Sequence, residues 1–73
     1  MKYPNIDAER ARRGMKKKEF AAALGVSIRS VINWQKGISE LPCGKLIEIA
    51  KLFGCSTDYL LGLNWSGGDR SGT

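Results

Sequence analysis

The sequence predicts an all-α domain built from five short helices. Apolar residues recur at helical spacing, glycine or proline separates the apolar segments, and no run of β-branched residues alternates as in a strand. The chain has 73 residues, which suits one small domain that buries only about 60% of the surface its unfolded chain exposes. No stretch of twenty apolar residues occurs, so the composition argues against a membrane span.

The first three predicted helices cover residues 6–13, 16–24 and 28–36. Asn5 is a candidate N-cap for the first of them, and Gly14 is its C-terminal stop. Gly25 ends the second helix, where a positive φ is expected because glycine alone adopts it at little cost. Ser27 is expected to cap the third helix by accepting a backbone N–H two or three residues further on.

The last two predicted helices cover residues 43–53 and 57–61. Pro42 suits the first position of the fourth helix, and Ser56 or Thr57 is expected to cap the fifth. Beyond Leu63 the chain is rich in glycine and serine, which is typical of a flexible segment. We therefore expect a folded domain over residues 1–64 and a flexible C-terminal tail over residues 65–73.

The positive charge is concentrated in one part of the chain. Residues 10–36 hold eight basic side chains and one acidic side chain, a net charge of +7, whereas the whole chain has a net charge of +5. A basic segment in a compact domain favours a polyanionic partner, although a solvated basic face is the simpler alternative.

The residue types argue against an enzyme and against a metal site or cofactor. The chain has no histidine, no paired carboxylates and no glycine-rich phosphate loop. Its two cysteines, Cys43 and Cys55, cannot complete a tetrahedral zinc site on their own. We interpret both as reduced, small apolar residues.

The predicted third helix has two different faces. Val31 and Trp34 lie three residues apart and are expected to point into the core, so Trp34 is interpreted as a core residue rather than a base-stacking one. Ile28, Arg29 and Asn33 are expected to form an exposed ridge that fits the major groove of B-form DNA. Arg29 suits guanine, Asn33 suits adenine or a phosphate, and Ile28 either touches a thymine methyl or shields the helix junction.

The order of these segments resembles the helix-turn-helix domain of phage repressors and Cro-type regulators, the xenobiotic-response-element-like family. The resemblance covers residues 5–63, about four-fifths of the chain. It is carried by Asn5–Arg10 with Gly14-Met15, by Lys18–Ala21, Leu24–Ser27 and Val31–Gly37, and by Leu46–Lys51 and Cys55–Gly62. It implies a compact lambda-repressor-like fold of five helices, in which helices 2 and 3 form the DNA-reading unit.

The resemblance and the exposed ridge together give a set of candidate contacts. The base contacts are Ile28, Arg29, Ser30 and Asn33. The phosphate contacts are Arg10, Lys16, Lys17, Ser27, Lys36 and Ser39.

Two residues depart from the pattern of the family. The family usually has glutamine at the position of Lys17, where lysine keeps a charge contact but blurs base reading. It also favours glutamate at the position of Gln35, paired with the helix 1 arginine. Arg10 is therefore expected to face a neutral amide and to be freer to reach a phosphate.

The resemblance further implies a sequence-specific transcriptional regulator of double-stranded DNA, with repression the expected role. It implies a homodimer on a palindromic operator, joined through Tyr59, Leu61, Leu63 and Trp65. The expected setting is the cytoplasm of a bacterium, nucleoid-associated and bacterial or phage-encoded, with no membrane or metal partner. The alternative is a protein-interaction module of the antitoxin or coactivator type that uses the same helical surface.

Overall fold

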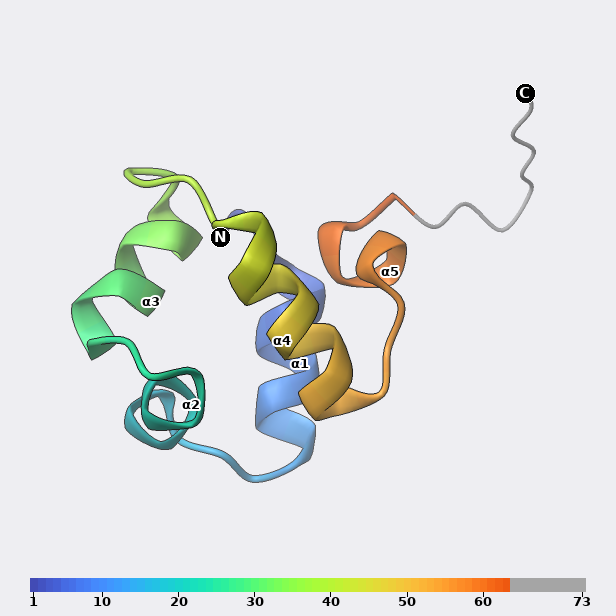
Figure 1. The fold of residues 1–73 in the computed structure, drawn as a ribbon, viewed down its shortest axis with the longest axis horizontal. Coiled ribbons are helices and arrows are strands. Elements are labelled where there is room, and N and C mark those ends of the chain that lie inside the picture. Colours follow the sequence, from blue (N-terminus) through green and yellow to red (C-terminus); the bar gives the residue numbers. More distant parts are fainter. Residues whose placement is uncertain (64–73) are drawn as a thin grey trace.

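The computed structural model describes residues 1–63, and these residues form five helices and no strand (Figure 1). The helices are α1 (Pro4–Arg12), α2 (Lys17–Leu24), α3 (Ile28–Lys36), α4 (Cys43–Phe53) and α5 (Thr57–Leu61). The predicted all-α class and the five-helix order are confirmed. The predicted tail over residues 65–73 lies outside the described residues and stays a prediction.

The predicted start of α1 is wrong. The helix begins at Pro4 with Tyr3 as its N-cap residue, and Asn5 lies inside the first turn. Proline suits this position because its φ is already helical and because the first N–H groups of a helix have no partner within it. The Asn5 side chain instead donates a hydrogen bond of 2.6 Å from Nδ2 to the backbone oxygen of Tyr59, which connects α1 to α5.

The other predicted boundaries hold to within one residue. Lys16 and Pro42 are the N-cap residues of α2 and α4, not the first helical residues. The cap predicted at Ser27 is confirmed, and of the two candidates for α5, Ser56 and Thr57, the cap is Ser56. Ser27 Oγ accepts the N–H of Ser30 at 3.2 Å, and Ser56 Oγ accepts the N–H of Tyr59 at 3.1 Å.

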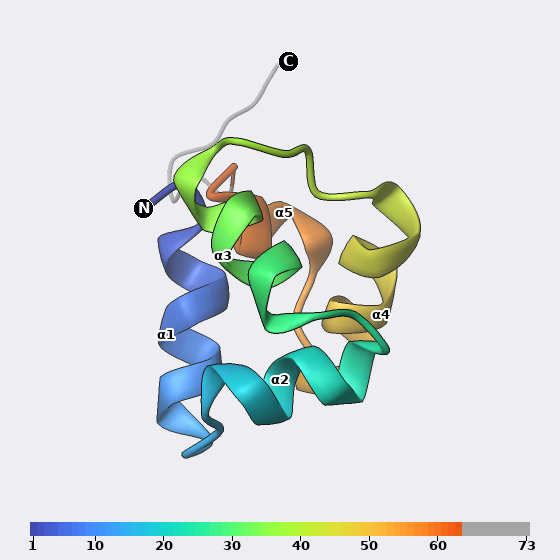
Figure 2. The ribbon, with the colours of Figure 1, turned by 90° about the vertical axis from the view of Figure 1, so that its left-hand side faces the viewer.

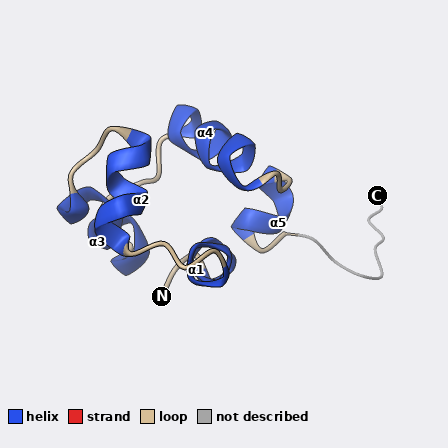
Figure 3. Cartoon of the chain, turned by 90° about the horizontal axis from the view of Figure 1, so that it is seen from below, coloured by secondary structure: helices blue, strands red, loops and turns tan. Residues whose placement is uncertain are grey.

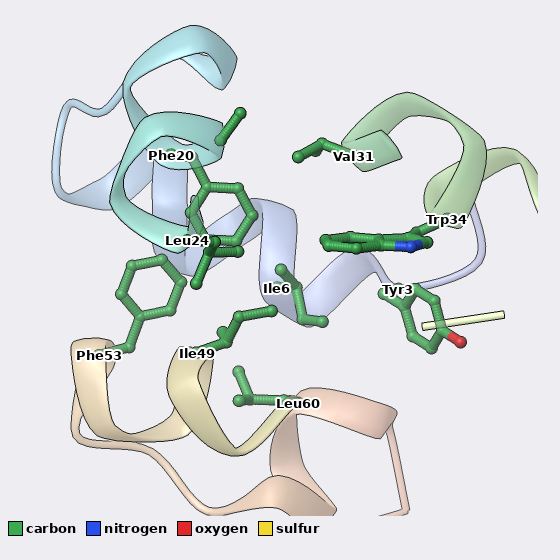
Figure 4. Close-up of a cluster of buried hydrophobic side chains, with 10 residues drawn as sticks. Tyr3, Ile6, Phe20, Leu24, Val31, Trp34, Ile49, Phe53 and Leu60 are labelled. Atoms are coloured by element: carbon green, nitrogen blue, oxygen red, sulfur yellow. The ribbon is translucent and has the colours of Figure 1, made fainter. Parts of the chain in front are cut away.

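The core lies where all five helices meet (Figure 4). Ile49 and Leu60 are fully buried, and the rings of Phe20 and Phe53 stack with their centroids 5.5 Å apart. Trp34 is buried beside Tyr3, as Figure 4 shows, so its interpretation as a core residue is confirmed. Cys43 is exposed and Cys55 is half-buried against the core, and neither forms a disulfide.

The helices are arranged with α3 and α5 on opposite sides of the molecule (Figures 1 and 3). α2 packs against α3 and α4, while α5 packs against α1 and α4. The start of the chain lies beside the end of α3 (Figure 2), where the backbone N–H of Lys2 donates to the backbone oxygen of Gln35 at 2.7 Å. This arrangement leaves α3 at one edge of the domain, covered on its inner side only.

Candidate nucleic-acid interface

A tight turn joins α2 to α3 and fixes the angle between them. Gly25 adopts a φ of +70° and Ala21, one turn earlier, is buried. The N–H of Val26 donates to the oxygen of Ala21 at 3.0 Å, and Lys45 Nζ on α4 donates to the oxygen of Leu24 at 2.7 Å. The small side chain of Ala21 and the left-handed glycine are what allow α3 to cross closely over α2. The contact of Lys45 was not anticipated from the sequence.

The two faces of α3 differ as predicted. Val31 and Trp34 are buried, with exposed fractions of 4% and 6%, whereas Ile28 is 45% exposed and Arg29 is exposed. Figure 2 shows α3 on the near side of the molecule, above α2 and in front of α4 and α5. The exposed face is therefore free to enter a groove from the outside.

Two polar candidates on α3, Ser30 and Asn33, are less exposed than Arg29, so the prediction that Asn33 stands on an exposed ridge is met only in part. Ser30 and Asn33 are half-buried, and the hydroxyl of Ser30 lies 3.2 Å from that of Ser27. The backbone oxygen of Asn33 accepts the N–H groups of Ile38 at 2.9 Å and Ser39 at 3.3 Å. These bonds place the exposed loop that follows α3 directly against its C-terminal end.

The start of α2 presents a row of exposed lysines. Lys16 is the N-cap residue, Lys17 and Lys18 are the first two residues of the helix, and all three are exposed. The Glu19 carboxylate accepts the N–H of Lys16 at 2.8 Å, which places a negative charge at the positive end of the helix. One acid partly offsets the three lysines, whose charges otherwise oppose the helix dipole.

The expected contact between Arg10 and Gln35 is not formed. The Arg10 guanidinium bonds Asp7 at 2.9 Å and the backbone oxygen of Met15, and only 15% of its side chain is exposed. The Gln35 amide instead bonds the backbone of Tyr3 through both of its polar atoms. Arg10 pairs with Asp7 because that carboxylate lies three residues earlier, on the same face of α1. Its phosphate contact stays a prediction that this geometry does not favour.

The buried carboxylate of Glu9 forms ion pairs with two further arginines. Glu9 is 4% exposed, and its oxygens accept hydrogen bonds from Arg12 at 2.6 Å, Arg13 at 2.5 Å and the Tyr59 hydroxyl at 2.8 Å. The hydrogen bonds from Arg12 and Arg13, and then the one from Tyr59, lower the pKa of Glu9 from 4.5 to about 2. The same contact with Glu9 raises the pKa of Tyr59. The spacing of three and four residues was visible in the sequence, but the burial of Glu9 was not.

Six of the seven basic side chains that lack an ion pair within residues 1–63 lie on α3, at the start of α2 or on the N-terminal segment that bonds α3, and the seventh, Lys51, lies on α4. Among them are the N-terminal lysine, the lysines at the start of α2, and the two cations of α3: Lys2, Lys16, Lys17, Lys18, Arg29 and Lys36. Lys2 was not anticipated, because nothing in its local sequence relates it to α3. Arranged in this way, the cations can neutralise a polyanion that runs past the exposed face of α3.

The candidate dimer residues are placed unevenly. Leu63, two residues after the end of α5, is 47% exposed. Leu61 is half-buried, and Tyr59 is half-buried with its hydroxyl donating to Glu9. Trp65 lies outside the described residues. These dimer contacts stay predictions, and Leu63 is the side chain that offers the most free apolar surface among the three described residues.

An exposed helix held over a second helix by a tight glycine turn, with unpaired cations around it, defines a helix-turn-helix DNA-binding domain. A helix-turn-helix family model of the Cro and phage repressor type matches residues 6–60. The chain belongs to this family, whose domains are DNA-binding regulators and not catalysts. No curated protein matches the chain.

None of the helices in the described part of the chain is both long and apolar enough to cross a bilayer. Residues 1–63 hold no group of three or more side chains of the kinds that ligate metal ions.

Proposed function

We propose that the chain is a sequence-specific transcriptional repressor that inserts α3 into the major groove of double-stranded DNA. The observation that supports this best is the two-faced character of α3. Its inner residues Val31 and Trp34 are buried, whereas Arg29 is exposed and has no ion-pair partner in residues 1–63. An exposed, unpaired guanidinium on a helix of this kind suits the two acceptors that guanine presents in the major groove.

The other candidates at the start of α2, on α3 and in the residues that flank α3 fit the same docking in different roles. Ile28 is available to a thymine methyl, while Ser30 and Asn33 reach bases from half-buried positions. Lys16, Lys17 and Lys36 are exposed and suit phosphates on either side of the groove, as do Ser27 and Ser39. Affinity then comes mainly from the cations, and sequence preference comes from the exposed face of α3.

The repressor is proposed to act as a homodimer on a palindromic operator. α5 lies on the side of the domain away from α3 (Figure 3), so a two-fold axis beside Leu63 would keep the two copies of α3 apart. Two half-sites one helical turn apart, about 34–36 Å, are then expected. Repression follows if such a dimer covers a promoter, and the site of action is then the cytoplasm.

The test is selection of bound duplexes from a random pool, followed by affinity measurements over a range of salt concentrations. We expect an enriched palindrome and a steep fall of affinity with salt. A promoter carrying the selected site should lose expression of a reporter gene when the chain is present. If no sequence is enriched and no salt-dependent DNA binding occurs, the proposal fails, and a protein-interaction role for the same surface becomes the better reading.

A further inference from the structure

A groove of about 550 Å³ lies between the first residues of the chain, the start of α2 and the end of α3. Its lining contains three lysines that are far apart in the sequence, Lys2, Lys17 and Lys36. It also contains Met1 and Ile32, which supply apolar surface. No acidic residue among residues 1–63 lines the groove. Three amines around an apolar floor without a carboxylate favour an anionic ligand that also has an apolar part.

The N-terminal segment is held in this place by specific hydrogen bonds. The Gln35 side chain accepts the N–H of Tyr3 at 2.7 Å through Oε1 and donates to the oxygen of Tyr3 at 3.0 Å through Nε2. The N–H of Lys2 donates to the backbone oxygen of Gln35 at 2.7 Å. One residue of α3 therefore fixes the backbone on both sides of the Lys2–Tyr3 peptide bond.

The stem of Lys2 lies beside the glycine that ends α3. A Cβ atom at Gly37 would lie 3.8 Å from Lys2 Cδ, and Gly37 has a φ of +78°. The ammonium group of Lys2 lies 5.6 Å from the centre of the Tyr3 ring, and it has no ion pair in residues 1–63. The positive charge of Lys2 therefore lies next to α3 and is not neutralised by a carboxylate of residues 1–63.

We propose that this groove holds a stretch of the DNA sugar–phosphate backbone, and that Lys2 is a phosphate contact which Gln35 positions. The three ammonium groups neutralise phosphate oxygens, and deoxyribose carbons lie against the apolar floor. The groove borders the same helix that carries Arg29, so a duplex with α3 in its major groove brings its backbone past this edge. The inference rests on the proposed DNA binding and adds a contact from outside the helix-turn-helix segment.

The test compares salt slopes, the change in log affinity per change in log salt concentration, on the selected duplex. Lys2→Ala should reduce the magnitude of the slope by about 0.9, the value for one phosphate contact. That loss corresponds to roughly eightfold weaker binding at about 0.1 M salt, vanishing towards 1 M. Lys51→Ala is the matched control, since Lys51 is an exposed lysine on α4 that does not line the groove; its slope should equal that of the unchanged chain.

Gln35→Ala separates positioning from stability. If Gln35 holds Lys2 in place, Gln35→Ala should reduce the slope as Lys2→Ala does, and the double variant should reduce it no further. A residue that only stabilises the fold would lower the melting temperature and leave the slope unchanged. The proposal is overturned if the unchanged chain binds the duplex but Lys2→Ala keeps the full slope. If the unchanged chain binds no duplex at all, it is the proposed function that has failed.

Discussion

Replacing Arg29 tests whether the chain reads sequence through α3. The guanidinium is exposed at the second position of the helix and has no ion pair among the described residues, so its full set of donors is available. A bidentate contact with guanine discriminates against a wrong base by about 1–3 kcal/mol. At room temperature this corresponds to a preference of roughly 5- to 160-fold at one base pair.

The assay measures the affinity of the unchanged chain, Arg29→Ala and Arg29→Lys for the selected duplex and for duplexes altered at single base pairs. Arg29→Ala should lose the preference at one position and keep it elsewhere. Arg29→Lys keeps the charge but loses the planar fork, so it should retain the salt slope and lose most of that preference. Equal weakening of all duplexes by Arg29→Ala would refute the reasoning and make Arg29 a phosphate contact.

Two further predictions concern stability. Because the pKa of Glu9 falls from 4.5 to about 2 on folding, its ionised form stabilises the fold above about pH 4.5, and this contribution is lost as the pH falls towards 2. Urea unfolding across that range should show a smaller pH dependence for Glu9→Gln, and an unchanged dependence would contradict the assignment. Ile49→Ala removes a fully buried side chain and should cost about 2–5 kcal/mol of unfolding free energy. Leu52→Ala, on the same helix but 44% exposed, should cost less than about 1 kcal/mol when both variants are unfolded with urea, and similar losses for both would argue against this core.

The elements that local chemistry determines were predictable from the sequence. Gly25 and Gly37 end helices in the left-handed region, and Ser27 and Ser56 supply the caps, so four boundaries follow from residues within one turn of them. The inner and outer faces of α3 likewise follow from the three-residue spacing of Val31 and Trp34. The predicted N-cap at Asn5 was wrong because local residue types gave two possible starts for α1. Both Pro4 and Asn5 are typical of a helix N-terminus, and packing of the whole domain determines which one is used.

Contacts between distant segments were not predictable in this way. Gln35 has a partner on Tyr3, 32 residues away, and Lys45 caps the end of α2 from 21 residues further along. No local spacing encodes such pairs, because they depend on how the helices pack. Lys2 became a candidate contact only when the fold placed it beside Gly37.

Some basic residues of the sequence are paired with carboxylates and are not expected to contact DNA. Replacing Arg13 tests this expectation. Its guanidinium bonds Glu9 and the backbone oxygen of Phe53, and it lies 4.6 Å from the centre of the Phe53 ring. A cation–π contact of about 1 kcal/mol alone corresponds to a change in melting temperature of roughly 4–8 °C for a domain of this size. Arg13→Ala should therefore melt at a lower temperature than the unchanged chain. Its salt slope on DNA should stay the same, because an arginine that is already bound to Glu9 neutralises no phosphate and so releases no counterions from DNA. A reduced slope with an unchanged melting temperature would show that Arg13 reaches the duplex, and the basic surface would then extend beyond α2, α3 and Lys2.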